Sequence, residues 1–138
     1  MKVFNSQICT SREQSERLLA LGVKPETADM AIEPDLESTY EVYYISAYPP
    51  SKRGVPAWSL HRLMEIMPQC IYHKNRMCFL FIDQSVYVQY RHSLYGASQT
   101  IMEQFMKSNL WDNLINCIEW LIKEGYFNKE YLNGTTEN

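Results

Sequence analysis

The most regular hydrophobic pattern of the chain lies between residues 110 and 124. Apolar side chains recur there every three or four positions, the spacing that gathers them on one side of an α-helix, and polar residues fill the other side. Asn109 can cap the first turn, and Gly125 suits the left-handed residue that follows a helix. The pattern predicts a helix over 110–124 whose core residues are Trp111, Leu114, Ile118 and Leu121.

Two shorter amphipathic segments predict helices in the first half of the chain. Thr10 begins the sequence TSRE, in which a hydroxyl and a carboxylate three residues later can cap a helix over 11–21, and Gly22 can end it. A second helix is expected to begin after a cap at Ser59 and to stop at Pro68. Each segment has one apolar side that must be buried against another part of the fold.

The remaining pattern is mostly that of strands and turns. Pro25 can start only a short helix, because Pro34 prevents a long continuation. Residues 40–48 are rich in aromatic and β-branched side chains, which favour a strand. Further strands are predicted near Ile71 and at 77–82 and 86–90, with turns at 74–75 and 83–85. A helix is predicted within 97–107, beginning at Ser98.

These elements predict an α+β fold. One small antiparallel sheet of about four strands would form a single layer, covered mainly on one face by two to four helices. The length of 138 residues fits one domain over 1–138, with a frayed tail from about residue 133 to 138.

The apolar runs are too short for a membrane protein. The longest, 77–82, is far below the roughly 20 residues of a membrane-spanning helix. The N-terminal residues also lack the apolar stretch of a secretion signal, so we expect a cytoplasmic protein with no membrane contact. Four cysteines are then expected to be reduced and mostly buried: Cys9, Cys70, Cys78 and Cys117.

The formal net charge of −3 argues against a protein built mainly to hold nucleic acid, because phosphate binding depends on Lys and Arg. The charge is unevenly distributed, however. Residues 52–92 carry six basic and two acidic side chains, whereas residues 1–51 and 93–138 are both acidic. The simpler interpretation is that these segments neutralise one another after folding; the alternative is a basic surface that includes Lys52, Arg53, Lys74 and Arg76.

Three sequence segments resemble a group of uncharacterised small proteins from gut Bacteroidales, some of them encoded in prophage-like or mobile regions. The segments are ICTSREQSERLLALGVKPETADM, VPAWSLHRLMEIMP and CIEWLIKEGYF, and together they cover a little over a third of the chain. No activity is assigned to this group. The resemblance therefore implies a source and a genomic setting, and no functional residue.

Three motifs with possible chemistry are each better explained structurally. Cys70, His73 and Cys78 have ligand types that zinc accepts, but alternation along a strand would direct Cys70 and His73 to opposite faces. His61 and Glu65 are four residues apart and fit a solvated helix edge. The segment LLALGVKPETADM resembles a helix-turn-helix, but the second helix would direct acidic residues toward phosphates.

The ten tyrosines are the feature that points most toward recognition, since a tyrosine pairs an apolar ring with a polar tip. Most of them fall in or beside the predicted strands, where they either cover the core or form a partner-binding face. The candidate partner-binding residues are Tyr43, Tyr48 and Tyr87, together with the basic residues Lys52, Arg53, Lys74 and Arg76.

The leading functional hypothesis is a non-enzymatic accessory or protein-interaction protein, and the resemblance implies a prophage or mobile element as its setting. The first alternative is binding of nucleic acid or an acidic partner through the basic middle segment, which the net charge disfavours. The second is a small enzyme or ligand-binding domain that uses His61, His73 or His92. No catalytic residue, cofactor or metal is assigned, and the expected partner is another protein.

Overall fold

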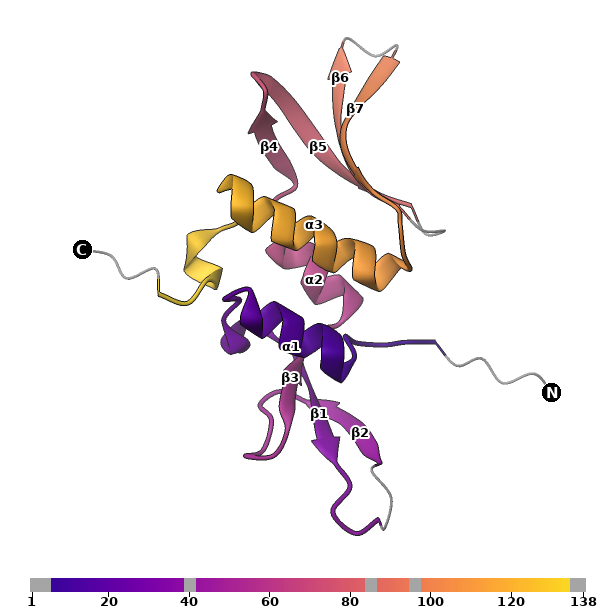
Figure 1. The fold of residues 1–138 in the computed structure, drawn as a ribbon, viewed down its shortest axis with the longest axis vertical. Coiled ribbons are helices and arrows are strands. Elements are labelled where there is room, and N and C mark those ends of the chain that lie inside the picture. Colours follow the sequence, from indigo (N-terminus) through magenta and orange to yellow (C-terminus); the bar gives the residue numbers. More distant parts are fainter. Residues whose placement is uncertain (1–5, 39–41, 84–86, 95–97, 135–138) are drawn as a thin grey trace, which may run out of the picture. The chain divides into compact units, whose positions relative to one another are not determined.

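The computed structural model describes residues 6–38, 42–83, 87–94 and 98–134 (Figure 1). In chain order the elements are α1 (Arg12–Ala20), η1 (Pro25–Thr27), β1 (Met30–Pro34), β2 (Tyr43–Ala47), β3 (Val55–Ala57), α2 (Leu60–Ile66), β4 (Cys70–His73), β5 (Arg76–Ile82), β6 (Val88–Leu94), β7 (Ser98–Phe105), α3 (Leu110–Glu124) and η2 (Lys129–Tyr131). They form two compact units. Unit 1 comprises Met1–Ile66 and Glu130–Asn138, and unit 2 comprises Met67–Lys129.

The fold is α+β, as predicted, but it has two antiparallel sheets instead of one. Unit 1 holds a sheet with the strand order β2-β1-β3, and unit 2 holds a sheet with the order β4-β5-β6-β7. Within the described ranges, no helix combines the length and the apolar character needed to cross a membrane.

Helix α1 begins one residue later than predicted. Ser11, not Thr10, is its N-cap: the Ser11 hydroxyl accepts a hydrogen bond from the Gln14 amide, and the Gln14 side chain accepts one from the Ser11 amide. The capping box is therefore S-x-x-Q, because a glutamine oxygen satisfies the cap amide as well as a carboxylate does. Gly22 adopts a positive φ of 94° after the helix, as its predicted stop requires.

Thr10 serves instead to hold the core of unit 1 together. Its buried hydroxyl accepts a hydrogen bond from the Trp58 amide at 3.0 Å and lies 2.8 Å from the Ser15 hydroxyl. The fully buried Trp58 indole donates to the Thr27 hydroxyl at 2.9 Å. These contacts connect α1, η1 and the end of β3 around one tryptophan.

The central strand of the first sheet was missed by the sequence prediction, which placed a short helix after Pro25. That helix is only the 3-10 turn η1, and Met30–Pro34 form β1. Ile32 of β1 pairs with Ile45 of β2 on one side and with Val55 of β3 on the other. Ala31, Ile32 and Glu33 are buried in succession, so both faces of β1 are covered and the strand lacks the alternation that identifies a half-exposed strand.

The second sheet is the predicted antiparallel meander, with one correction. Residues Ser98–Phe105 form strand β7, whereas a helix beginning at Ser98 was predicted. Strand β7 pairs along β6, and such long-range pairing overrides a weak local preference. The turn predicted at 74–75 is present, with φ of 51° at Lys74 and 62° at Asn75. Of the turn predicted at 83–85, Gln84 and Ser85 lie outside the described residues.

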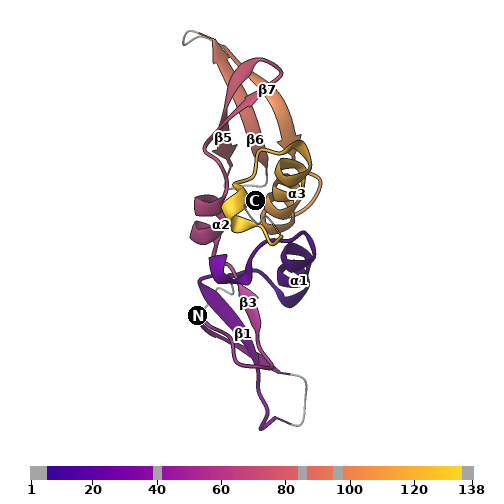
Figure 2. The same cartoon turned by 90° about the vertical axis from the view of Figure 1, so that its left-hand side faces the viewer.

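Helix α3 packs against one face of the four-stranded sheet, mainly against β6 and β7, and Figures 1 and 2 show that the strands extend beyond it. Its bounds, its Asn109 cap and its Gly125 stop agree with the sequence prediction. Trp120 of α3 has four aromatic rings from unit 2 within 6.0 Å of its own ring centre: His73, Tyr90, Phe105 and Tyr126. Leu114, Ile118 and Leu121 are buried as predicted, but Trp111 is only half-buried, because it lies toward the edge of the apolar side.

Candidate protein-interaction surfaces

Strand β2 forms a free edge of the sheet in unit 1 (Figure 1). It pairs with β1 along one side, and no described strand pairs with its other side. Half of the backbone amide and carbonyl groups of an edge strand point outward, where another chain can bind them. The opposite edge strand, β3, is only three residues long and contains Pro56, whereas β2 has five residues and no proline or charge.

Apolar side chains are exposed on both faces of β2. Tyr44 is 53% exposed on one face, and Ile45 is 45% exposed on the other. Proteins usually protect sheet edges with charged residues, prolines or bulges, and β2 has none of these devices within its bounds. An unprotected apolar edge is the surface used when an extended peptide joins a sheet as a further strand.

An apolar groove adjoins β2 on the face that carries Ile45. It has a volume of about 370 Å³ and lies between β2 and the segment that precedes α1. Ile32 of β1 and Cys9 belong to the small buried cluster at its base, and Ile8 is exposed at its side. An apolar side chain of a bound peptide would fit this groove.

Tyr43, which the sequence analysis selected, lies at the rim of this groove. The Arg12 guanidinium donates a hydrogen bond to the Tyr43 hydroxyl at 2.5 Å and lies 4.4 Å from the centre of its ring. Arg12 also pairs with Glu16 at 3.8 Å. Helix α1 therefore fixes the orientation of Tyr43, which is exposed and held in place before any partner binds.

A second exposed apolar surface covers the face of the four-stranded sheet opposite α3. Side chains alternate between the two faces of a strand, so the neighbours of the α3-facing His73, Cys78 and Tyr90 point away from the helix. Tyr72 on β4 is 61% exposed and Phe79 on β5 is 46% exposed. We call this surface the open sheet face; its apolar members are Tyr72, Met77, Phe79, Phe81 and Ile101.

The other selected residues do not form one described site. Tyr48 and Tyr87 are half-buried, Tyr48 beside the loop after β2 and Tyr87 before β6. The basic residues are all exposed and fall into two pairs. Lys52 and Arg53 lie in a loop of unit 1 that adjoins Tyr44, whereas Lys74 and Arg76 lie on the β4–β5 hairpin of unit 2. A single basic surface made by all four cations was the less favoured alternative, and the described structure does not test it.

The histidine and cysteine side chains also do not come together in one site. Cys70 is exposed, whereas His73 and Cys78 are buried on the other face of the sheet, so the three side chains do not converge, in line with the alternation expected along the strand. Among the described residues, no group of three His, Cys, Asp or Glu side chains could hold a metal ion. His61 lies 3.6 Å from Glu65 on the exposed side of α2, as the interpretation of a solvated edge predicts. The segment that resembles a helix-turn-helix forms α1, η1 and β1, so a strand follows the short turn of helix in place of a second DNA-reading helix.

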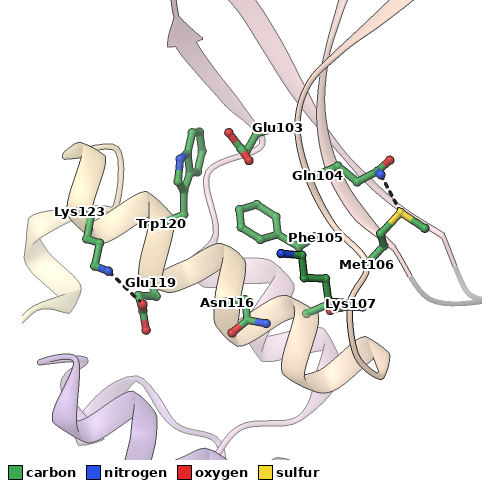
Figure 3. Close-up of a pocket in the computed structure, with 10 residues that line it drawn as sticks. Glu103, Gln104, Phe105, Met106, Lys107, Asn116, Glu119, Trp120 and Lys123 are labelled. Carbon is green, nitrogen blue, oxygen red and sulfur yellow. Dashed lines mark hydrogen bonds and ion pairs between the residues drawn. The ribbon is translucent and has the colours of Figure 1, made fainter.

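A pocket of about 400 Å³ lies between β7 and α3 in unit 2 (Figure 3). In Figure 3 the carboxylate of Glu103 lies near the rings of Trp120 and Phe105, whose centres are 6.0 Å apart. Glu119 accepts a hydrogen bond from Lys123 at 3.2 Å at the far side. This mixture of rings with both signs of charge can accept a small polar molecule, but the charges favour no single class of ligand.

The sequence did not identify Tyr44, Ile45, Tyr72 or Phe79 as site residues. Their importance depends on strand order and on which face α3 covers, and neither is a local property of the sequence. Comparisons with protein-family models, with curated proteins and with solved structures gave no match, so no family is assigned to the chain.

Proposed function

We propose that this protein acts by binding another protein, and that strand β2 is the binding edge. The observation that carries the proposal is an edge strand of five residues with apolar side chains exposed on both faces and no charge, proline or bulge within it. An accessory role in a prophage or mobile element belongs to the same proposal, on the basis of the three resembling segments.

The chemistry of β2 specifies the kind of partner. Backbone hydrogen bonds along the free edge suit any extended peptide, so the side chains must supply selectivity. Every second residue of the peptide would face the groove beside Ile45, where an apolar side chain replaces water at Cys9 and Ile32. The partner is therefore an extended segment with apolar residues at alternate positions.

The histidines support an enzyme less well than β2 supports binding. His73 lies with Nδ1 2.7 Å from the Tyr126 hydroxyl beneath α3, and His92 has Nδ1 3.0 Å from the Met77 carbonyl oxygen. His61 is exposed in unit 1. The partner of His73 is a phenol whose pKa is raised by burial, and the partner of His92 is a carbonyl oxygen, so neither contact supplies an activated nucleophile.

Selection from a library of random displayed peptides tests the proposal. We expect the full chain to enrich peptides with alternating apolar residues. Their affinity, measured by fluorescence anisotropy, should fall at least tenfold for Ile45→Lys, because the new charge would be buried in the complex. Met64→Lys is the matched control, since Met64 is similarly exposed but lies on α2.

Two results would contradict the proposal. One is failure to enrich any peptide with this pattern. The other is an equal loss of affinity in Ile45→Lys and Met64→Lys, which would show that the added charge acts without regard to position. Sedimentation of the chain without peptide tests whether the partner is a second copy of this chain. A dimer that Ile45→Lys dissociates would show that it is.

A further inference from the structure

We infer a second binding activity that goes beyond the proposed function: the open sheet face binds single-stranded nucleic acid. Antiparallel sheets bind single strands by stacking bases on exposed aromatic rings of neighbouring strands, while cations contact the phosphates. The open sheet face and the hairpin beside it provide both kinds of group.

The rings lie on adjacent strands at a suitable spacing. Tyr72 on β4 pairs with Met77 on β5, and Cys70 pairs with Phe79, so Tyr72 and Phe79 are diagonal neighbours about 7 Å apart across the strand pair. Both rings are about half exposed or more in the absence of a partner. Two consecutive bases of an extended strand can therefore stack on them.

The charge of this region complements a polyanion. Arg91 belongs to the open sheet face, where its guanidinium lies 4.5 Å from the centre of the Phe81 ring and donates to the Gln89 side chain at 2.6 Å. Lys74 is exposed in the turn that follows Tyr72, whereas Arg76 pairs with the α3-facing His73 and therefore belongs to the other face of the sheet. Within strands β4–β7, no described side chain on this face is acidic; Asp83 comes only after β5 has ended.

The two units differ in charge, although the net charge of the whole chain does not show it. Unit 2 contains six Lys or Arg and five Asp or Glu residues, whereas unit 1 contains seven and eleven. The acidic excess of the chain therefore belongs to unit 1. The acidic residues of unit 2 include Glu103 and Glu119, which line the pocket on the α3 side of the sheet.

Fluorescence anisotropy with labelled 12-nucleotide single-stranded RNA and DNA, and with a duplex of the same length, tests this inference on the full chain. We expect micromolar binding of the single strands at about 50 mM salt and weaker binding of the duplex. If Arg91 and Lys74 contact phosphates, raising the salt from about 50 to about 200 mM should lower the affinity about sevenfold. In Lys74→Ala the same increase in salt should lower it only about threefold.

Substitution of the rings separates stacking from charge. Tyr72→Ala and Phe79→Ala should each weaken binding about tenfold at both salt concentrations, because a lost stacking contact is not screened. Tyr44→Ala is the matched control: it removes an exposed tyrosine from the other sheet and should leave nucleic-acid binding unchanged while it weakens peptide binding. Circular dichroism would verify that each variant is folded.

Several outcomes would overturn the inference. They are no binding of either single strand at the lower salt, equal binding of duplex, or unchanged affinity in folded Tyr72→Ala and Phe79→Ala. None of these results affects the peptide-binding proposal, which depends on residues of unit 1.

Discussion

The hydroxyl group of Thr10 connects separate segments of unit 1 through buried hydrogen bonds. Thr10 accepts a hydrogen bond from the Trp58 amide and bonds to the Ser15 hydroxyl, and it is fully buried. Replacement by valine keeps the shape of the side chain but leaves both partners without this contact, and a buried polar group without a partner costs about 1–3 kcal/mol. We expect Thr10→Val to lower the free energy of unfolding by about that amount in urea denaturation.

Thr10→Ser is the control for this prediction, because serine retains the hydroxyl and loses only a methyl group. If Thr10→Ser lowers the free energy of unfolding as much as Thr10→Val does, packing of the methyl group, and not hydrogen bonding, makes Thr10 important.

The four cysteines should differ strongly in reactivity. Cys70 is exposed, whereas Cys9, Cys78 and Cys117 are buried, and burial raises the pKa of each of these three thiols. Because the thiolate is the reactive form, a thiol reagent at neutral pH should modify one cysteine rapidly and the other three only as the fold opens. Cys70→Ser should abolish the rapid phase. Two or more rapid thiols in the native protein would contradict the described burial.

Helix α3 is the element on which unit 2 depends most. Ile118 is fully buried on it, and truncation of a packed isoleucine leaves a cavity that costs about 2–5 kcal/mol. We expect Ile118→Ala to lower the free energy of unfolding by that amount. Ile122→Ala is a matched control on the same helix and should cost clearly less, since Ile122 is only half-buried. Equal losses, or a loss under about 0.5 kcal/mol for Ile118→Ala, would show that α3 does not organise the core.

Elements with strong local signals could be predicted from the sequence. The Asn109 cap, the apolar spacing and Gly125 define α3 without reference to the rest of the chain, and the structure confirms its bounds. Strands β1 and β7 could not be predicted, because each becomes a strand through pairing with segments distant in sequence. Local preference gave a helix in both places.

The candidate surface was predicted only in part, for a related reason. Tyr43 could be selected because it is a tyrosine in a predicted strand, and it does lie at the groove. Ile45 has an ordinary strand composition, and it becomes significant only because β2 is at an edge of its sheet. Strand order depends on the whole chain, so the sequence of β2 alone does not reveal its free edge.

At the scale of the whole molecule, unit 2 is inserted between two segments of unit 1. The sequence predicts a single domain, and this stays a prediction. A domain of about 60 residues, which is close to the size of unit 2, buries only about 60% of the surface that its unfolded chain exposes and is marginally stable alone. We therefore expect a single calorimetric unfolding transition whose calorimetric and van't Hoff enthalpies agree. Two separate transitions, or one that Ile118→Ala divides, would show that the units unfold independently.

The central claim is that a partner peptide pairs with the free edge of β2, and amide hydrogen exchange measured by NMR tests it most directly. With a selected peptide bound, alternate amides of Tyr43–Ala47 should exchange more slowly, because only every second amide of a strand points to its outer edge. The effect should disappear in Ile45→Lys. Slower exchange confined to other residues, with the β2 amides unchanged, would contradict the account.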